Sequence, residues 1–175
     1  MSKAVMLSIR PKWVEKIASG EKTIEVRKTK PKLETPFKCY IYCTLPKYPH
    51  EDFIATDYPM PQFYGGGKVV GEFTCDQIID AWWDYVPDAI TREVTGGNLE
   101  ALDGIGMTDE ELFSYVGDSM RGHCYGWHIS DLLIYDQPKG LDEFTRLRET
   151  KFGSEPVTIK RAPQSWCYVE AMKDE

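Results

Sequence analysis

The chain has 175 residues and a formal net charge of -7, with 42% hydrophobic and 28% charged residues. This composition is typical of an ordinary globular protein, and the length favours a single domain with one core. No apolar run approaches the roughly 18 residues of a membrane span, and the run behind Met1 is too short for a secretory signal. We therefore expect no membrane contact and predict a cytoplasmic location.

The acidic charge is unevenly distributed along the chain. Residues 1–38 hold ten Lys and Arg against four Glu, a net charge of +6, so residues 39–175 carry -13. Such asymmetry indicates one surface that meets an anion. The five cysteines are odd in number and scattered, which is typical of reduced thiols, and their spacing matches no zinc motif. We therefore expect neither a metal ion nor a cofactor.

The first predicted elements are a strand and a short helix. Val5–Ile9 is an apolar run of strand length, and Pro11 suits the first helical position, where its missing N–H group is not needed. Trp13 and Ile17 lie on one helical face, and Gly20 ends the helix as a left-handed C-cap. The helix has only about two turns, so packing rather than propensity must hold it.

A second strand is predicted at Lys22–Lys28, because apolar and polar residues alternate there. Ile24 and Val26 face one way, whereas Glu25 and Arg27 face the other. Two interpretations of the polar face are open. At the surface, the two residues would form an ion pair worth about 0–1 kcal/mol. In a cleft, a buried pair would hold Arg27 rigid and present its remaining donors to a phosphate or a base edge.

The next predicted strands flank a long irregular segment. Phe37–Thr44 alternates as a strand, and residues 45–64 are rich in proline and aromatic side chains, as in a loop packed on the body. The glycines at 65–67 have the wrong spacing for a phosphate loop, and the strand Lys68–Cys75 follows them where a helix would be needed. These glycines therefore predict a turn.

The middle of the chain, Ile78–Gly122, is acidic and is predicted to be mostly helical. Thr108 and Glu111 form a capping box ahead of an apolar stretch, which predicts the start of one helix. Trp82 and Trp83 are adjacent, so only one of them can point fully inward on either a helix or a strand. The other is an exposed aromatic that could mark a partner surface.

Strands return in the last third of the chain. Tyr125–Tyr135 and Gln164–Val169 alternate as strands, Leu141–Phe144 has the length of one helical turn, and Thr150–Ile159 is predicted to be a polar connection. Strands thus dominate both ends of the chain, with helices inserted between them. This pattern predicts an α+β protein whose sheet is curled into a small barrel.

The N-terminal motifs resemble the signature of the ASCH domain family, a branch of the PUA-like superfamily. They are Ser8-Ile9-x-Pro11, the helix end Ser19-Gly20, and Lys22-Thr23-x-Glu25-x-Arg27. Gly71–Phe73, Tyr125–Leu132 and Pro163–Tyr168 are similar to later strands of small bacterial and phage ASCH proteins. The resemblance implies a single ASCH/PUA-like domain at 1–175. Its fold would be a mixed β-barrel (pseudo-barrel) with helices covering its ends and an acidic, partly helical insertion at about 80–122.

The same resemblance implies a function. ASCH domains are mostly proposed to bind RNA or nucleotides in a cleft lined by the Lys-Thr-x-Glu-x-Arg strand, so the implied partner is RNA, a nucleotide or a modified nucleoside. The net charge of the whole chain predicts weak, salt-sensitive binding to a phosphate backbone. The oligomeric state stays open. The candidate ligand-binding residues are Lys12, Lys22, Glu25, Arg27, Ser165 and Trp166.

A small-hydrolase branch of the family, which removes the acetyl group from N4-acetylcytidine, gives an alternative. It uses a Lys as base, a Thr three positions later as nucleophile and a Glu further on. Lys22 matches the base, but Glu25 stands in the nucleophile's position; Ile105 lies closest to the third, with Asp103 a nearby substitute. Lys22 and Glu25 are the catalytic candidates, and these residues favour a binding module over an enzyme. Further alternatives are RNA cleavage in the same cleft and an acidic protein–protein interaction module.

Overall fold

The structure is a computed structural model that describes residues 2–45, 66–85, 94–117 and 120–172. Of the irregular segment expected at 45–64, all but Leu45 lies outside these residues. The elements, in chain order, are β1 (Lys3–Ile9), α1 (Pro11–Ala18), β2 (Ile24–Arg27), β3 (Phe37–Cys43), β4 (Lys68–Tyr85), β5 (Val94–Gly97), η2 (Leu99–Leu102), α2 (Asp109–Val116), β6 (Arg121–Lys139), η3 (Leu141–Glu143), β7 (Thr145–Thr150), β8 (Gly153–Thr158) and β9 (Trp166–Glu170).

Strands dominate the described part of the chain. Most of them form one mixed sheet in the order β2-β6-β4-β3-β1-β9, with β5 added beside β4. β1 and β3 are parallel, whereas the other neighbouring strands are antiparallel. The long strands β4 and β6 shift register at three places between Val69 and Ile78, and such bulges bend strands and let a sheet curl. The predicted α+β fold with a curled sheet is confirmed.

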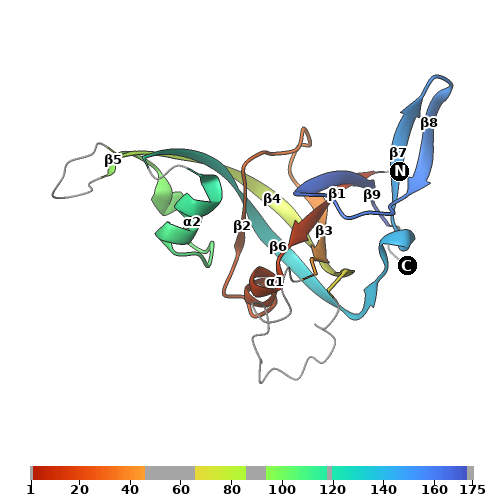
Figure 1. The fold of residues 1–175 in the computed structure, drawn as a ribbon, viewed down its shortest axis with the longest axis horizontal. Helices are drawn as coiled ribbons and strands as arrows, with labels where there is room; N and C mark the ends of the chain where they lie inside the picture. Colours follow the sequence, from red (N-terminus) through yellow and green to blue (C-terminus); the bar gives the residue numbers. More distant parts are fainter. Residues whose placement is uncertain (1, 46–65, 86–93, 118–119, 173–175) are drawn as a thin grey trace.

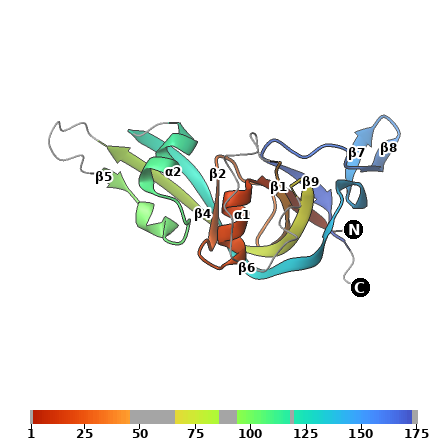
Figure 2. The same ribbon diagram turned by 60° about the horizontal axis from the view of Figure 1, so that its bottom comes forward.

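The two long strands also set the layout of the molecule. Figures 1 and 2 show β4 and β6 running through most of its length, with α2 and β5 at one end. β1, β3 and β9 lie towards the other end, where the β7–β8 hairpin stands out from the body. Helix α1 lies beside β2, between these two ends.

The two α-helices follow local sequence signals. α1 has Pro11 at its start and is followed by Gly20, whose φ is +79°. α2 has the predicted capping box: the Glu111 N–H group donates to Thr108 Oγ1, and the Thr108 N–H group donates to the Glu111 carboxylate. Gly117 closes α2 with a φ of +95°. No helix within the described ranges has the length and apolar character needed to cross a bilayer.

Three clusters of buried apolar side chains hold these elements together. The first lies between α1 and the sheet and includes Val14 and Trp127. The second lies around β9 and η3, where the rings of Tyr40 and Phe144 meet edge to face at 4.9 Å. The third joins β2 to α2 and to the far ends of β4 and β6. It includes Ile24, Val26, Trp83 and Leu112. The apolar residues of β2 therefore enter a core, which leaves its alternate residues to the opposite face.

The prediction of a mostly helical segment at Ile78–Gly122 is wrong. β4 continues through this segment to Tyr85 and pairs with β6 and β5, so the helices described there are η2 and α2. The sequence does alternate with the period of a strand, since Ala81 and Trp83 are buried whereas Trp82 is 48% exposed. The prediction that only one of the two tryptophans points inward is confirmed.

The predicted polar connection at Thr150–Ile159 is also wrong, because most of it forms β8, which pairs with β7. Both strands of this hairpin are largely exposed, so neither shows the apolar alternation of a half-buried strand. The strand predicted at Tyr125–Tyr135 is confirmed within the longer β6. The strand predicted from Lys22 starts only at Ile24, because the Lys22 N–H group bonds back to the Lys16 carbonyl instead of joining the ladder.

Candidate functional site

Three charged side chains are buried together at β2. Lys22, Glu25 and Arg27 are 2%, 6% and 6% exposed, respectively. Glu25 Oε2 lies 3.3 Å from Lys22 Nζ, and Glu25 Oε1 lies 2.9 Å from Arg27 Nη2. One carboxylate therefore serves two cations, and the cluster carries a net positive charge when all three groups are ionised.

The Arg27 guanidinium joins β2 to two other parts of the chain. Nη2 donates to the Ser8 carbonyl at 2.9 Å, while Nη1 donates to the carbonyl and hydroxyl of Ser165 at 3.2 Å and 3.3 Å. The Ser8 hydroxyl in turn donates to the Pro163 carbonyl at 2.6 Å. Arg27 Nε is buried and has no hydrogen-bond partner within the described residues. The structure thus places Ser165, one of the predicted ligand residues, in direct contact with Arg27.

The acidic middle of the chain supplies a hydrogen-bond acceptor for the Lys22 ammonium group. Nζ donates to the Ile105 carbonyl at 2.7 Å, and the neighbouring Thr23 N–H group donates to the Gly104 carbonyl at 2.8 Å. Gly104 has a φ of +103°, and a Cβ atom there would collide with the Thr23 hydroxyl, so only glycine fits this approach. Burial lowers the pKa of Lys22, while the Glu25 carboxylate acts in the opposite direction.

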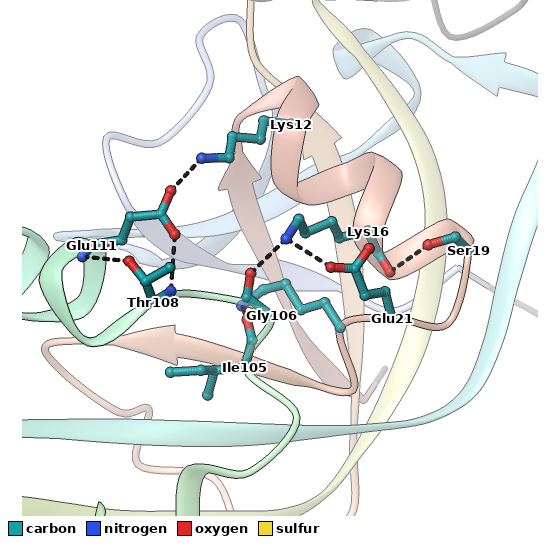
Figure 3. Close-up of polar contacts among 9 residues, drawn as sticks. Lys12, Lys16, Ser19, Glu21, Ile105, Gly106, Thr108 and Glu111 are labelled. Atoms are coloured by element: carbon teal, nitrogen blue, oxygen red, sulfur yellow. Dashed lines mark hydrogen bonds and ion pairs between the residues drawn. The ribbon is translucent and has the colours of Figure 1, made fainter. Parts of the chain in front are cut away.

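Helix α1 is tied to the same middle segment by its own lysines (Figure 3). Lys16 Nζ donates to the Gly106 carbonyl at 2.9 Å and pairs with Glu21 at 2.7 Å. Lys12 forms an ion pair with Glu111, the capping residue of α2, and this hydrogen bond lowers the pKa of Glu111. Lys12, a predicted ligand contact, is therefore partly exposed and already faces a carboxylate.

The Trp13 ring, from α1, lies among three ammonium groups. Its centroid is 4.5 Å from Lys12 Nζ, 5.5 Å from Lys22 Nζ and 5.7 Å from Lys16 Nζ. Aromatic faces attract cations, so the indole helps to keep this positive charge together. The sequence predicted Trp13 only as part of the apolar face of the helix.

Trp166, the remaining predicted ligand residue, follows Ser165 but has partners of its own. Its indole Nε1 donates to the Thr29 hydroxyl at 2.9 Å, and its ring centroid lies 6.0 Å from that of Trp127 and 5.4 Å from that of Tyr168. The Lys32 N–H group donates to the Tyr168 hydroxyl at 2.7 Å. These contacts fix the basic turn after β2 against β9, next to the Arg27 contacts.

The backbone of residues 104–106 is the part of this site that the sequence did not point to directly. Ile105 is the residue closest to the third catalytic position of the hydrolase branch, and its carbonyl does lie against Lys22. The residue has no side-chain carboxylate, so it offers Lys22 only its backbone oxygen. The sequence signal for this contact is the pair of glycines on either side of Ile105, since glycine lets one backbone segment lie close to another. Both Gly104 and Gly106 have a positive φ in the structure.

Other groups that could carry chemistry are two histidines and the cysteines. His128 Nδ1 lies 2.6 Å from Asp76 Oδ1, and His123 Nε2 lies 2.6 Å from Asp80 Oδ1, in partly exposed pairs on β4 and β6. All five cysteines are free, and burial raises the pKa of Cys39 well above its usual value, which keeps it a thiol. Among the described residues, no three His, Cys, Asp or Glu side chains are grouped as metal ligands would be.

Comparison with known proteins bears on the fold. No protein-family model and no curated protein matches the sequence. Solved structures of an ASCH protein from Zymomonas mobilis do match. A point variant of it has a TM-score of 0.51 at 16% identity, over 97% of this chain and 91% of that one. The unmodified protein has a TM-score of 0.50 at 15% identity, over 95% of this chain and 87% of that one.

The chain has the fold of an ASCH domain. The fold that the N-terminal motifs implied, a mixed pseudo-barrel of the ASCH type, is therefore confirmed. An identity of 15–16% carries the fold alone, so the ligand and the roles of the buried charged residues have to be argued from this chain's own side chains.

Proposed function

We propose that this ASCH-fold protein binds RNA, or a nucleotide-like part of it, in a cleft whose floor is formed by Lys22, Glu25 and Arg27. The proposal is carried by one observation: two buried cations share a single carboxylate. Removing a charge from water is costly unless an opposite charge compensates it. A phosphate group at this cluster would supply the missing negative charge and accept hydrogen bonds from lysine and arginine donors.

The residues around this floor suit the same ligand. Lys12, Ser165 and Trp166 would line the rim, with Trp13 and Trp166 providing aromatic rings on which a base can stack. Approach of a phosphate would require partners to change, because Arg27 now donates to Ser8 and Ser165. Since the whole chain is acidic, the binding should be weak and should weaken further with salt.

The test is a titration of fluorescent single-stranded RNA at low and at moderate salt, followed by anisotropy. Arg27→Lys keeps the charge but loses the planar fork of donors, so the affinity should fall about tenfold. Lys68→Ala, which removes an exposed cation from the start of β4, is the matched control and should bind as the wild type does. Equal affinities for wild type and Arg27→Lys, or no saturable binding at low salt, would refute the proposal.

The hydrolase alternative has one specific observation in its favour. Burial lowers the pKa of Lys22, which is the direction that a general base requires. Against it, the Glu25 carboxylate occupies the nucleophile's position and pairs with both cations, while Thr23 lies against Gly104. Release of cytidine from N4-acetylcytidine, lost in Lys22→Met, would decide for this alternative.

The interaction-module alternative depends on Trp82. This exposed indole is flanked along β4 by Asp80 and Asp84, which are paired with His123 and Arg121. An exposed aromatic between carboxylates is what that alternative predicts. Light scattering of wild type and Trp82→Ser over a range of concentrations would reveal self-association through this surface.

A further inference from the structure

A second basic feature lies at the opposite end of the molecule from α2. The β7–β8 hairpin and the segment that leads from it to β9 form a groove of about 670 Å³. This volume is within the usual range for small-ligand sites of about 300–1,000 Å³. Its lining combines apolar residues, including Val157, Ile159 and Pro163, with four cationic residues. These are Arg146, Arg148, Lys160 and Arg161.

The cationic side chains of this groove are largely uncompensated. All four residues are exposed, and only Arg148 has an ion pair among the described residues, with Glu155. Residues 145–161 contain five Lys and Arg against two Glu, a net charge of +3, within a part of the chain that is otherwise strongly acidic. Concentrated positive charge on an acidic protein indicates a local site for an anion.

The tip of the hairpin presents an aromatic ring to solvent. Phe152 is 101% exposed. The turn that carries it is held in place, because the Phe152 N–H group donates to Thr150 Oγ1 at 3.2 Å and the Thr150 hydroxyl donates to the Gly153 carbonyl at 2.7 Å. Figures 1 and 2 show the hairpin projecting from the body, so no core of the domain needs this ring. A fully exposed aromatic ring on a turn with a fixed backbone suits stacking on an unpaired base.

The groove is connected to the buried charged cluster by the chain itself. The lining includes Pro163, whose carbonyl accepts the hydrogen bond from Ser8, and two residues later Ser165 contacts Arg27. A strand of nucleic acid that leaves the Arg27 region along this segment would therefore meet Arg161, Lys160 and the hairpin in turn.

We propose that the β7–β8 hairpin and its groove are a second binding site for single-stranded RNA. Arg146, Lys160 and Arg161 contact phosphates, and Phe152 stacks on an unpaired base beyond them. This inference rests on the proposed function, because it extends the path of the same RNA away from the cleft. The strand must be single, since bases in a duplex are stacked on one another and are not accessible to a side chain.

The experiment compares two RNAs, one of about six and one of about 20 nucleotides, by anisotropy. The variants are Phe152→Ser and the double change Arg146→Ser with Lys160→Ser, all on exposed side chains that leave the cores intact. For the long RNA, we expect the affinity to fall about fivefold or more in Phe152→Ser and about tenfold in the double variant. The salt dependence of the double variant should become shallower by about two phosphate contacts. The short RNA should bind all three proteins within about twofold of one another.

Each remaining outcome counts against at least one of the two proposals. Unchanged binding of the long RNA by both hairpin variants, with loss in Arg27→Lys, would overturn the hairpin site and leave the cleft. Loss of long-RNA binding in the hairpin variants but not in Arg27→Lys would overturn the cleft and leave the hairpin. If the wild type binds neither RNA at low salt, both proposals are wrong.

Discussion

The side chain of Lys22 lies in an environment very different from water. Its ammonium group is buried and makes one hydrogen bond to the Ile105 carbonyl and one ion pair to Glu25, which Arg27 shares. A surface lysine would keep three bonds to water. The folded protein therefore favours the neutral form of Lys22 more than the unfolded chain does, which is why its pKa lies below the ordinary value.

This shift predicts a pH dependence. Between the lowered folded pKa of Lys22 and its usual value of 10.5, the unfolded chain binds more protons than the folded chain does. The contribution of Lys22 to the free energy of unfolding therefore rises as the pH increases through that window. The buried cysteines, Cys39 for example, have raised pKa values and act in the opposite direction, so the total is not informative.

The measurement that isolates Lys22 is the difference in free energy of unfolding between wild type and Lys22→Met, from urea denaturation at several pH values. The cysteine contributions cancel in this difference. We expect the wild type to gain stability relative to the variant as the pH approaches 10.5 from below. A difference that is constant with pH would mean that Lys22 titrates alike in the folded and unfolded chains.

At the scale of the elements, the predictable parts were those with local signals. Helix α1 has Pro11 and Gly20 at its ends, and α2 has its capping box, so both can be located from a few neighbouring residues. The extension of β4 and the hairpin of β7 and β8 depend on partner strands elsewhere in the chain. An acidic, partly alternating segment therefore resembles a helix in sequence, and an exposed strand without an apolar face resembles a loop.

The same distinction applies to the site. Lys22, Glu25 and Arg27 could be selected because their side chains form a spaced motif on one strand. The loop at 104–106 contributes backbone carbonyls, and any residue has a carbonyl, so the sequence carries no side-chain signal for this contact. Only Gly104 and Gly106 indicate the contact, because a Cβ atom at either position would crowd Thr23 or Lys22.

The docking of this loop on β2 can be tested by paired glycine substitutions. Gly104→Ala introduces a Cβ atom that collides with Thr23, at a position with a φ of +103°. Gly117→Ala is the control, because its φ of +95° is similar but a Cβ atom there meets nothing within 4 Å. We expect Gly117→Ala to cost about 1 kcal/mol and Gly104→Ala clearly more, roughly 2–4 kcal/mol, in urea denaturation. Equal losses would show that the loop is not held closely against β2.

At the scale of the whole molecule, the acidic middle of the chain is in contact with elements from both of its sides in the sequence. The residues of η2 and α2 pack on the end of β4 around Trp83 and on the start of β6 around Cys124. Both strands continue from there into the first cluster. Lys12, Lys16 and Lys22 add polar contacts from α1 and β2 to the segment at 105–111. We therefore propose that residues 1–175 form one domain, in which the segment expected as an insertion also completes the candidate site.

One domain should unfold as one cooperative unit. Trp83 lies in the third cluster, whereas Trp13, Trp127 and Trp166 lie in or against the first. Trp83→Phe should destabilise the protein by roughly 1–2 kcal/mol. Its urea midpoint should fall equally by circular dichroism and by the fluorescence of the remaining tryptophans. The adjacent Trp82→Phe, on an exposed indole, should leave the midpoint unchanged. The contrary outcome is a split transition in Trp83→Phe, with an early loss of dichroism and an unshifted fluorescence transition. The middle segment would then be a separate folding unit, because destabilising the third cluster would leave the first cluster, beneath α1, as stable as before.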